Sequence, residues 1–342
     1  MTFAIDAGGD LSASLLNTAA HARQAEELGA DGVILTETKH DSFVSLTLAA
    51  QATERVALFS AITVAFSRNP MTVAVAANDI QELSGGRLIL GLGSQVQPHI
   101  EQRFSMPWSR PAARMREFVA AVREIWGSFA SGERPRFRGE FYTHTLMNPV
   151  FDPGPNPHGN PPLWLAAVGE RMTEVTGEVA DGLVAHPFTT RAYVEQVTLP
   201  ALRRGAEAAG RAVPGIAFPV FVVLGRDEAE LRAASSAVAR QIAFYGSTPS
   251  YLPVLEVHGW GAKGERLNAA VRRGEWSEIG SIVDEAMLRE FACVGSPEQV
   301  AAQLRERYGD LSERVTFSAP YDVDRRTWAE LYTALRGPSV RA

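Results

Sequence analysis

The stretch Ser84-Gly85-Gly86-Arg87-Leu88-Ile89-Leu90-Gly91-Leu92-Gly93-Ser94-Gln95-Val96-Gln97 decides the fold of this chain. Its apolar run has no polar face, which is typical of a parallel strand that helices cover on both sides. Gly91 and Gly93 remove side chains where the strand ends, so either the backbone bends there or a flat group lies against it. We therefore predict a central buried strand over residues 87–92 and leave both explanations of the glycines open.

Short apolar runs alternate with helical patterns along the rest of the chain. Eight runs are expected to form strands, at residues 3–6, 32–35, 56–64, 87–92, 163–168, 182–186, 216–224 and 314–318. Strand, helix and strand repeat within about thirty residues, as in βαβ units. This alternation predicts an α/β fold, a (β/α)8 TIM barrel, with a doubly wound open sheet as the alternative. No Gly-x-Gly-x-x-Gly motif follows the first strand, which favours the barrel.

The same alternation predicts one barrel domain over residues 1–342. Insertion segments are expected at about 94–110, 127–162 and 246–292, after strands four, five and seven. Loops of this length are unusual unless they are functional or disordered. Within the second segment, residues 138–142 could pair as a small hairpin.

Composition excludes several classes of protein. The 342 residues are 46% hydrophobic with a net charge of −6, so the chain can bury a large core and offers no basic surface for nucleic acid. The longest nearly apolar runs are about half the length that crosses a bilayer, and the first residues do not resemble a secretory signal. We expect a cytoplasmic protein with a small-molecule substrate, without a membrane or nucleic-acid partner. Cys293 is the lone cysteine, expected to be buried, and no metal-site spacing occurs.

In a barrel, the chemistry is carried at the carboxyl ends of the strands. The residues there are Asp6, residues 37–40, 60–67, 93–99 and 166–173, His186 and residues 318–321. His40 can take or give a proton near neutral pH, although a histidine in a polar loop is more often structural. Glu37 could orient His40, bind substrate or merely end the strand.

Residues 166–173 predict an anion site. Small residues and Gly169 let backbone N–H groups approach a phosphate, and the helix that follows presents its positive N-terminus. Arg171 could add charge, or it could be an ordinary solvated helix residue.

Five motifs in order give the chain a family resemblance. They are residues 37–43 (Glu-Thr-Lys-His-Asp-Ser-Phe), 67–70 (Ser-Arg-Asn-Pro), 84–94 around the fourth strand, 166–169 (Ala-Ala-Val-Gly) and 180–182 (Ala-Asp-Gly). Over nearly its whole length the chain resembles the bacterial luciferase-like family, in particular its deazaflavin (coenzyme F420)-dependent oxidoreductases. Relatives often have proline where this chain has Ser42, so the turn after His40 departs from the family pattern.

The resemblance implies a barrel that carries a flavin-type ring in its mouth, either F420 or, alternatively, FMN. Carried over by position, it makes His40 and Glu37 the catalytic residues. The implied cofactor-binding residues are Ser60, Ala61, Thr63, Gly93, Ser94, Gln95, His99, Ala166, Ala167, Val168 and Gly169. It also implies a non-prolyl cis peptide at about Ser60-Ala61. Gln95 and His99 could instead simply face water.

The function that follows is hydride transfer between the deazaflavin ring and an unidentified organic substrate. One alternative is an FMN-dependent luciferase-like monooxygenase that uses O2, and another is a non-catalytic flavin-binding protein of the same fold. Relatives commonly pair through early helices, and residues 43–52 and 73–83 are apolar enough for such an interface. We therefore expect a homodimer.

Overall fold

The computed structural model describes residues 3–8, 14–275 and 281–337. The chain forms two compact units. The amino-terminal unit contains residues 7–184 and 200–216, and the carboxy-terminal unit contains residues 1–6, 185–199 and 217–342. These units are defined by contacts within the structure and do not show whether the chain unfolds in one step. The single domain over residues 1–342 therefore stays a prediction.

The amino-terminal unit is built on parallel strands in the order β2-β3-β5-β8-β9, with β4 also paired to β5. The strands are β2 (Gly32–Leu35), β3 (Ala57–Ser60), β4 (Thr63–Val64), β5 (Leu88–Gly93), β8 (Leu163–Ala166) and β9 (Gly182–Val184). Every residue of β2 and β5 is buried. The fourth predicted strand is therefore a central buried strand, because β3 and β8 cover its two edges.

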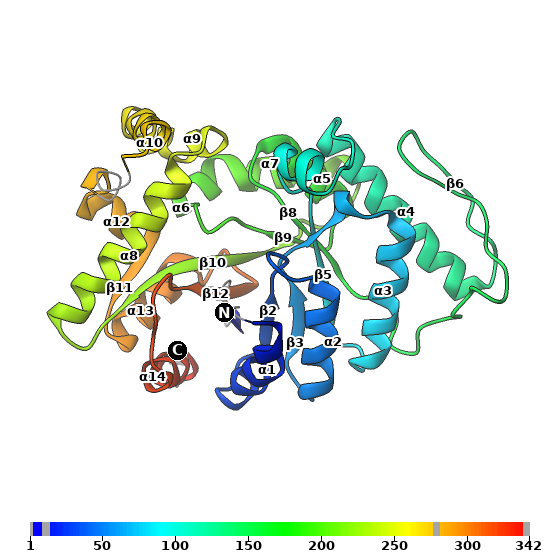
Figure 1. Ribbon diagram of the computed structural model, residues 1–342, viewed down its shortest axis with the longest axis horizontal. Helices are drawn as coiled ribbons and strands as arrows, with labels where there is room; N and C mark the ends of the chain where they lie inside the picture. Colours follow the sequence, from blue (N-terminus) through cyan, green and yellow to red (C-terminus); the bar gives the residue numbers. More distant parts are fainter. Residues whose placement is uncertain (1–2, 9–13, 276–280, 338–342) are drawn as a thin grey trace. The chain divides into compact units, whose positions relative to one another are not determined.

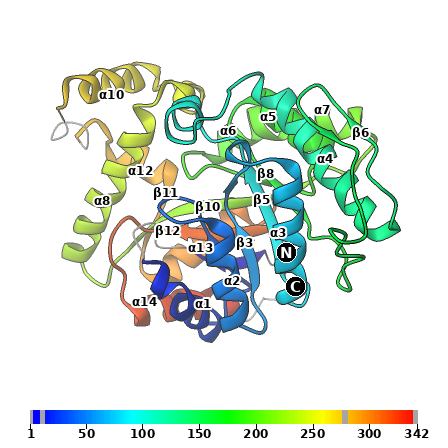
Figure 2. The ribbon, with the colours of Figure 1, turned by 45° about the vertical axis from the view of Figure 1, so that its right-hand side comes forward.

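Helices pack beside these strands, and Figure 2 shows α2 and α3 alongside β3 and β5. The helices are η1 (Leu15–Asn17), α1 (Thr18–Glu27), α2 (Ser42–Ala52), η2 (Ala65–Ser67), α3 (Pro70–Leu83), η3 (His99–Arg103), α4 (Pro111–Ser131), α5 (Glu170–Val179) and α7 (Leu199–Ala208). Asn69 caps α3 and Pro70 occupies its first turn, as the sequence predicts.

The carboxy-terminal unit has its own parallel strands, in the order β11-β10-β12-β1. They are β1 (Ala4–Ala7), β10 (Gly215–Leu224), β11 (Ala292–Gly295) and β12 (Arg314–Ser318). The helices are α6 (Arg191–Tyr193), η4 (Val194–Thr198), α8 (Glu228–Gly246), η5 (Pro249–Tyr251), α9 (Leu252–Glu256), α10 (Gly261–Arg273), α12 (Glu285–Phe291), α13 (Pro297–Tyr308) and α14 (Arg325–Arg336).

The fold class is a (β/α)8 barrel, as predicted, with β1, β2, β3, β5, β8, β9, β10 and β12 as its strands in chain order. The strand β11 was not predicted from the sequence, because it begins where the third expected insertion ends and is not one of the eight strands of the strand-helix alternation. Its partner is the second half of β10, where Phe221 pairs with Ala292 and Leu224 with Gly295.

The insertions need one correction. The segment from residue 94 to residue 110 does separate β5 from α4, and the segment after α8 carries further helices. No insertion follows the fifth strand, however, because only residues 167–169 connect β8 to α5. The second segment instead leads from α4 into β8, and it contains a small antiparallel hairpin of β6 (Phe137–Arg138) and β7 (Thr143–His144). Figure 1 labels β6 on this segment, beyond α4.

Arg87, the residue before the fourth barrel strand β5, holds the carboxyl end of α2. Its guanidinium donates to the carbonyl oxygens of Ser84 (2.7 Å), Ala50 (3.1 Å), Thr53 (2.9 Å) and Val56 (3.0 Å), and to the Thr53 hydroxyl (2.9 Å). All five N–H donors of the side chain are thus used. A cation at a helix C-terminus is also favoured by the helix dipole.

We expect Arg87→Met to lower the free energy of unfolding by about 2–4 kcal/mol, because it leaves several carbonyls without a donor. Arg87→Lys should give an intermediate loss, since an ammonium has three donors. Urea titration of the two variants measures both effects. The matched control is Arg134→Met at an exposed arginine, with a change within about 0.5 kcal/mol. Equal losses at the two positions would contradict this role of Arg87.

Candidate cofactor and active site

Glu37 follows β2, and its carboxylate binds groups from three neighbouring segments. It accepts hydrogen bonds from the backbone N–H of Val64 (3.0 Å), the hydroxyl of Ser42 (3.2 Å) and the guanidinium of Arg68 (2.9 Å). The Glu37 and Arg68 side chains are only 7% and 14% exposed. Of the three roles that the sequence leaves open, these contacts favour a strand-end anchor, and a catalytic role for Glu37 stays a prediction.

Arg68 fixes the other end of the same loop. Besides Glu37, it binds the carboxylate of Asp41 at 2.6 Å, and Asp41 in turn caps α2 by accepting from the N–H of Phe43 at 2.8 Å. The Ser42 hydroxyl also bonds that of Thr63 at 2.8 Å. Arg68 belongs to one of the sequence motifs, but no role could be predicted for it, because its two partners lie about thirty residues earlier in the chain.

His40 lies between these two anchored carboxylates. Its side chain is half-buried, and within the described part of the chain it has no hydrogen-bond partner. The residues on either side are held by Arg68, so the imidazole is carried on a fixed loop with its nitrogens available to a ligand.

The Ser60 hydroxyl is committed to the protein, since it donates to the carbonyl of Gly91 (3.0 Å) and accepts from the N–H of Gly91 (2.9 Å). Ser60 is also fully buried. This geometry does not favour contact between the Ser60 hydroxyl and a cofactor. The backbone of Ser60 lies next to a cis peptide. The structure places that cis bond at Ala61–Ile62, one residue beyond the position that the resemblance implies.

The glycines of β5 are explained by neighbouring residues of the protein. A Cβ at Gly91 would overlap the carbonyl oxygen of Ser60, and a Cβ at Gly93 would lie 2.7 Å from Cδ1 of Ile62. The strand continues through Gly93. Close approach of the β3–β4 segment therefore accounts for both glycines, rather than a tight turn.

The loop after β5 returns to the loop after β2. Ser94 and Gln95 are half-buried, and Gln95 has a positive φ of 61°, with its side-chain oxygen accepting from the N–H of Val96 at 3.1 Å. His99 is exposed and begins η3. Arg103, at the end of η3, donates to the carbonyl of Thr38 at 2.8 Å. The loops that carry His40 and Gln95 are thus joined directly.

Residues 166–169 lead into the N-terminus of α5 with an open approach. Gly169 is the N-cap residue, and no side chain caps the helix. A Cβ at Gly169 would meet no atom within 4 Å. The first N–H groups of a helix have no partner inside it, so those of α5 can bind an anion such as a phosphate. Glu170 carries a negative charge in this first turn and pairs with Arg204 at 3.3 Å.

Asp6, a strand-end candidate of the carboxy-terminal unit, has a structural role. Its carboxylate is 1% exposed and binds the Arg314 guanidinium twice, at 2.6 and 2.8 Å. This pair joins β1 to β12. Within the residues that the structure describes, no three His, Cys, Asp or Glu side chains gather as a metal site would require, and no helix has the length and apolar character to span a membrane.

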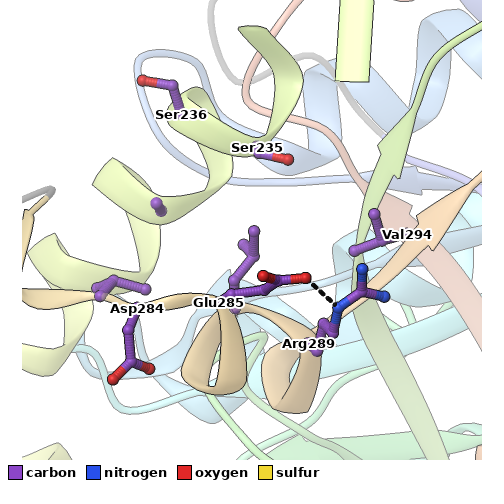
Figure 3. Close-up of a pocket in the computed structure, with 9 residues that line it drawn as sticks. Ser235, Ser236, Asp284, Glu285, Arg289 and Val294 are labelled. Atoms are coloured by element: carbon purple, nitrogen blue, oxygen red, sulfur yellow. Dashed lines mark hydrogen bonds and ion pairs between the residues drawn. The ribbon is translucent and has the colours of Figure 1, made fainter. Parts of the chain in front are cut away.

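A hollow of about 310 Å³ lies elsewhere in the carboxy-terminal unit, between α8, α12 and β11 (Figure 3). Its charged groups are already paired: Arg289 binds Glu285 at 2.9 Å, and Asp284 caps α12 and binds Lys263. It includes none of the residues predicted from the sequence. We do not assign the chemistry to it.

Comparisons with known proteins identify the family of this chain. The model of the family described as luciferase-like monooxygenase matches residues 1–313. The chain belongs to this family. It is therefore a luciferase-like oxidoreductase, and the sequence-based family prediction is confirmed.

Three similar proteins illustrate the family. An uncharacterized protein of Mycobacterium tuberculosis is 49% identical over 311 residues, covering 89% of this chain and 92% of the relative. The 5,10-methylenetetrahydromethanopterin reductase of Methanolobus tindarius is 28% identical, covering 85% and 86%. The solved structure of the coenzyme F420-dependent tetrahydromethanopterin reductase from Methanopyrus kandleri has a TM-score of 0.79 at 22% identity, covering 98% of each chain.

The free energy of unfolding can test whether Glu37 is a structural anchor and His40 is not. Glu37→Gln keeps the shape but removes the charge that holds Arg68, so we expect the free energy of unfolding to fall by about 1–3 kcal/mol. His40→Gln breaks no hydrogen bond to the described residues and should change it by less than about 0.5 kcal/mol. Urea unfolding of the two variants compares them. A larger loss for His40→Gln would show that the two roles are reversed.

Proposed function

We propose that this protein is an F420-dependent oxidoreductase that transfers a hydride between the deazaflavin ring and an organic substrate. The structural observation that carries the proposal is the open, uncapped N-terminus of α5, a fit for the phosphate of such a cofactor. The reductase activity named for the Methanolobus tindarius relative, and the F420 dependence named for the Methanopyrus kandleri structure, support this choice of cofactor.

The proposal gives each part of the amino-terminal unit a task. The N–H groups at the start of α5, next to Gly169, bind the phosphate. The segment around Ala61–Ile62 and the loop at Ser94 and Gln95 line the place of the ring. When bound, the deazaflavin supplies the hydride chemistry. His40 donates or accepts a proton at the substrate, and Arg68, through Glu37 and Asp41, holds the His40 loop in place.

The second candidate is an FMN-dependent monooxygenase that uses O2, which the description of the matching family favours. Titration of the protein with F420 and with FMN, followed by fluorescence quenching, separates the two. Tighter binding of F420 supports the deazaflavin enzyme, and tighter binding of FMN supports the monooxygenase. Cofactor binding without turnover on a broad substrate panel would leave the third alternative, a flavin-binding protein.

The phosphate assignment predicts a charge effect at Gly169. Gly169→Asp places a carboxylate at the N-cap, where it can itself accept from the free N–H groups of α5. The fold should be retained, because the new side chain enters open space, while cofactor affinity falls by at least about tenfold through repulsion. Gly169→Asn is the neutral control with the same shape, and it should lose less. Unchanged affinity in a folded Gly169→Asp variant would refute the assignment.

The proton role predicts a kinetic effect at His40. His40→Ala should lower kcat by about 10²- to 10⁴-fold, with cofactor affinity much less affected, because the phosphate and ring contacts remain. His40→Asn can still form hydrogen bonds but cannot titrate, so it separates positioning from proton transfer. Turnover is followed as the change in deazaflavin absorbance between about pH 5 and pH 9. If both variants match the parent, His40 is structural and Glu37 takes the role.

Self-association also remains part of the proposal. The helices expected at an interface, α2 and α3, each expose an apolar side chain, with Val44 46% and Leu83 47% exposed. A homodimer through these helices, a small-molecule substrate and a cytoplasmic location stay predictions.

A further inference from the structure

His186, two residues beyond β9, has a protonation pattern that its hydrogen bonds define. The backbone N–H of Phe188 donates to Nδ1 of His186 at 3.0 Å. Because a backbone N–H can only donate, Nδ1 must carry a lone pair, and the proton of the neutral ring is on Nε2. Nε2 lies 3.1 Å from the hydroxyl of Tyr251 and donates to it.

The Tyr251 hydroxyl is therefore an acceptor toward His186, and its own proton points elsewhere. In the part of the chain that the structure describes, no acceptor takes that proton. A hydroxyl that accepts a hydrogen bond is polarised and becomes a better donor. Burial lowers the pKa of His186 to about 4 and raises that of Tyr251 to about 12, so both groups are neutral at pH 7 and the pattern is stable.

Aromatic rings surround this pair. The His186 ring stacks on Tyr251 with centroids 4.5 Å apart and meets the edge of Tyr245 at 4.7 Å. Phe188 packs against Tyr251 at 5.9 Å and stacks on Phe291 at 4.5 Å. His186, Tyr245 and Tyr251 are only half-buried. A molecule that reaches them meets flat aromatic rings and the hydroxyl of Tyr251.

The length of β10 brings Tyr251 to this place. The N–H of Ala185 bonds to the carbonyl of Ala217, near the start of β10, whereas the strand continues to Leu224. Near the end of α8, Tyr245 meets Phe221 of this extension at 6.3 Å and His186 at 4.7 Å, and η5 then brings Tyr251 to His186. His186 lies beyond the carboxyl end of a barrel strand, which is where barrel enzymes bind their substrates.

We propose that the Tyr251 hydroxyl, oriented by His186, is a substrate-binding donor for the carbonyl oxygen, or an equivalent imine nitrogen, of a planar uncharged substrate. The choice of a C=O or C=N group rests on the proposed function, since a hydride acceptor contains such a bond. The donor itself follows from the hydrogen bonds alone.

The test uses 4-(dimethylamino)cinnamaldehyde, a flat aldehyde whose absorbance moves to longer wavelength when its oxygen accepts a hydrogen bond. The intact protein should bind it saturably and give this red shift. Tyr251→Phe should lose most of the shift and bind about 2- to 10-fold more weakly, the effect of one hydrogen bond. The matched control is Tyr245→Phe, because that hydroxyl already bonds Gln241, and it should keep both shift and affinity.

Three results would overturn the proposal: no saturable shift with the intact protein, an unchanged shift in Tyr251→Phe, or an equal loss in Tyr245→Phe. The titration contains no flavin. Its failure therefore leaves F420 binding to be judged by its own titration, and a failure to bind F420 leaves the aldehyde result standing.

Discussion

The candidate site depends on the hydrogen bonds and the ion pair that the Glu37 carboxylate forms. Glu37 lies two residues beyond the buried strand β2, and its N–H still bonds the carbonyl of Ile62 at 3.3 Å. Its carboxylate binds the backbone N–H of Val64 and the guanidinium of Arg68. One negative charge thus adds side-chain hydrogen bonds to the segment that follows the last register pair of β2 and β3, Leu35 with Ser60. Since Arg68 also binds Asp41, the loop between the two acidic residues is held at both ends.

This arrangement separates structural from chemical groups among residues close in sequence. Glu37, Asp41 and Ser42 have their hydrogen bonds satisfied by the protein, whereas His40 has none from the described residues. Because Glu37, Asp41 and Ser42 hold the loop, the His40 side chain can remain available to a ligand while its backbone stays fixed. An acid-base group requires such a fixed position.

The carboxy-terminal unit uses the same device with uncharged groups. A backbone N–H sets the tautomer of His186, and His186 sets the direction of the Tyr251 proton. In both units, a group that could act on a substrate is held in place through residues that are themselves bound to the backbone: Glu37 and Arg68 hold the loop of His40, and His186 orients the Tyr251 hydroxyl. The interactions differ in kind because the buried charge of Glu37 is compensated by the guanidinium of Arg68, whereas His186 and Tyr251 are neutral groups among aromatic rings.

Much of this protein was determined by local sequence. The buried run 88–92 fixed a central parallel strand, Asn69 and Pro70 fixed the start of α3, and the ordered motifs fixed the family. These features depend on periodicity and on contacts a few residues apart, which a sequence displays directly. The strand β11 was missed because it lies outside the alternation of eight strands and helices from which the barrel was predicted. The second insertion was counted after the fifth strand, although its residues, 127–162, precede the strand predicted at 163–168.

Only the tertiary structure decided which polar residues are free. Arg68 lies 31 residues from Glu37, and Tyr251 lies 65 residues from His186. The space beside Gly93 is taken by Ile62, a neighbour in the sheet and not in the sequence. Hydrogen-bond partners are chosen by distance in space, and parallel strands bring together residues that a connecting helix separates along the chain. For that reason the sequence could name His40 and Glu37 together, and only the folded chain showed that one of them is already bound.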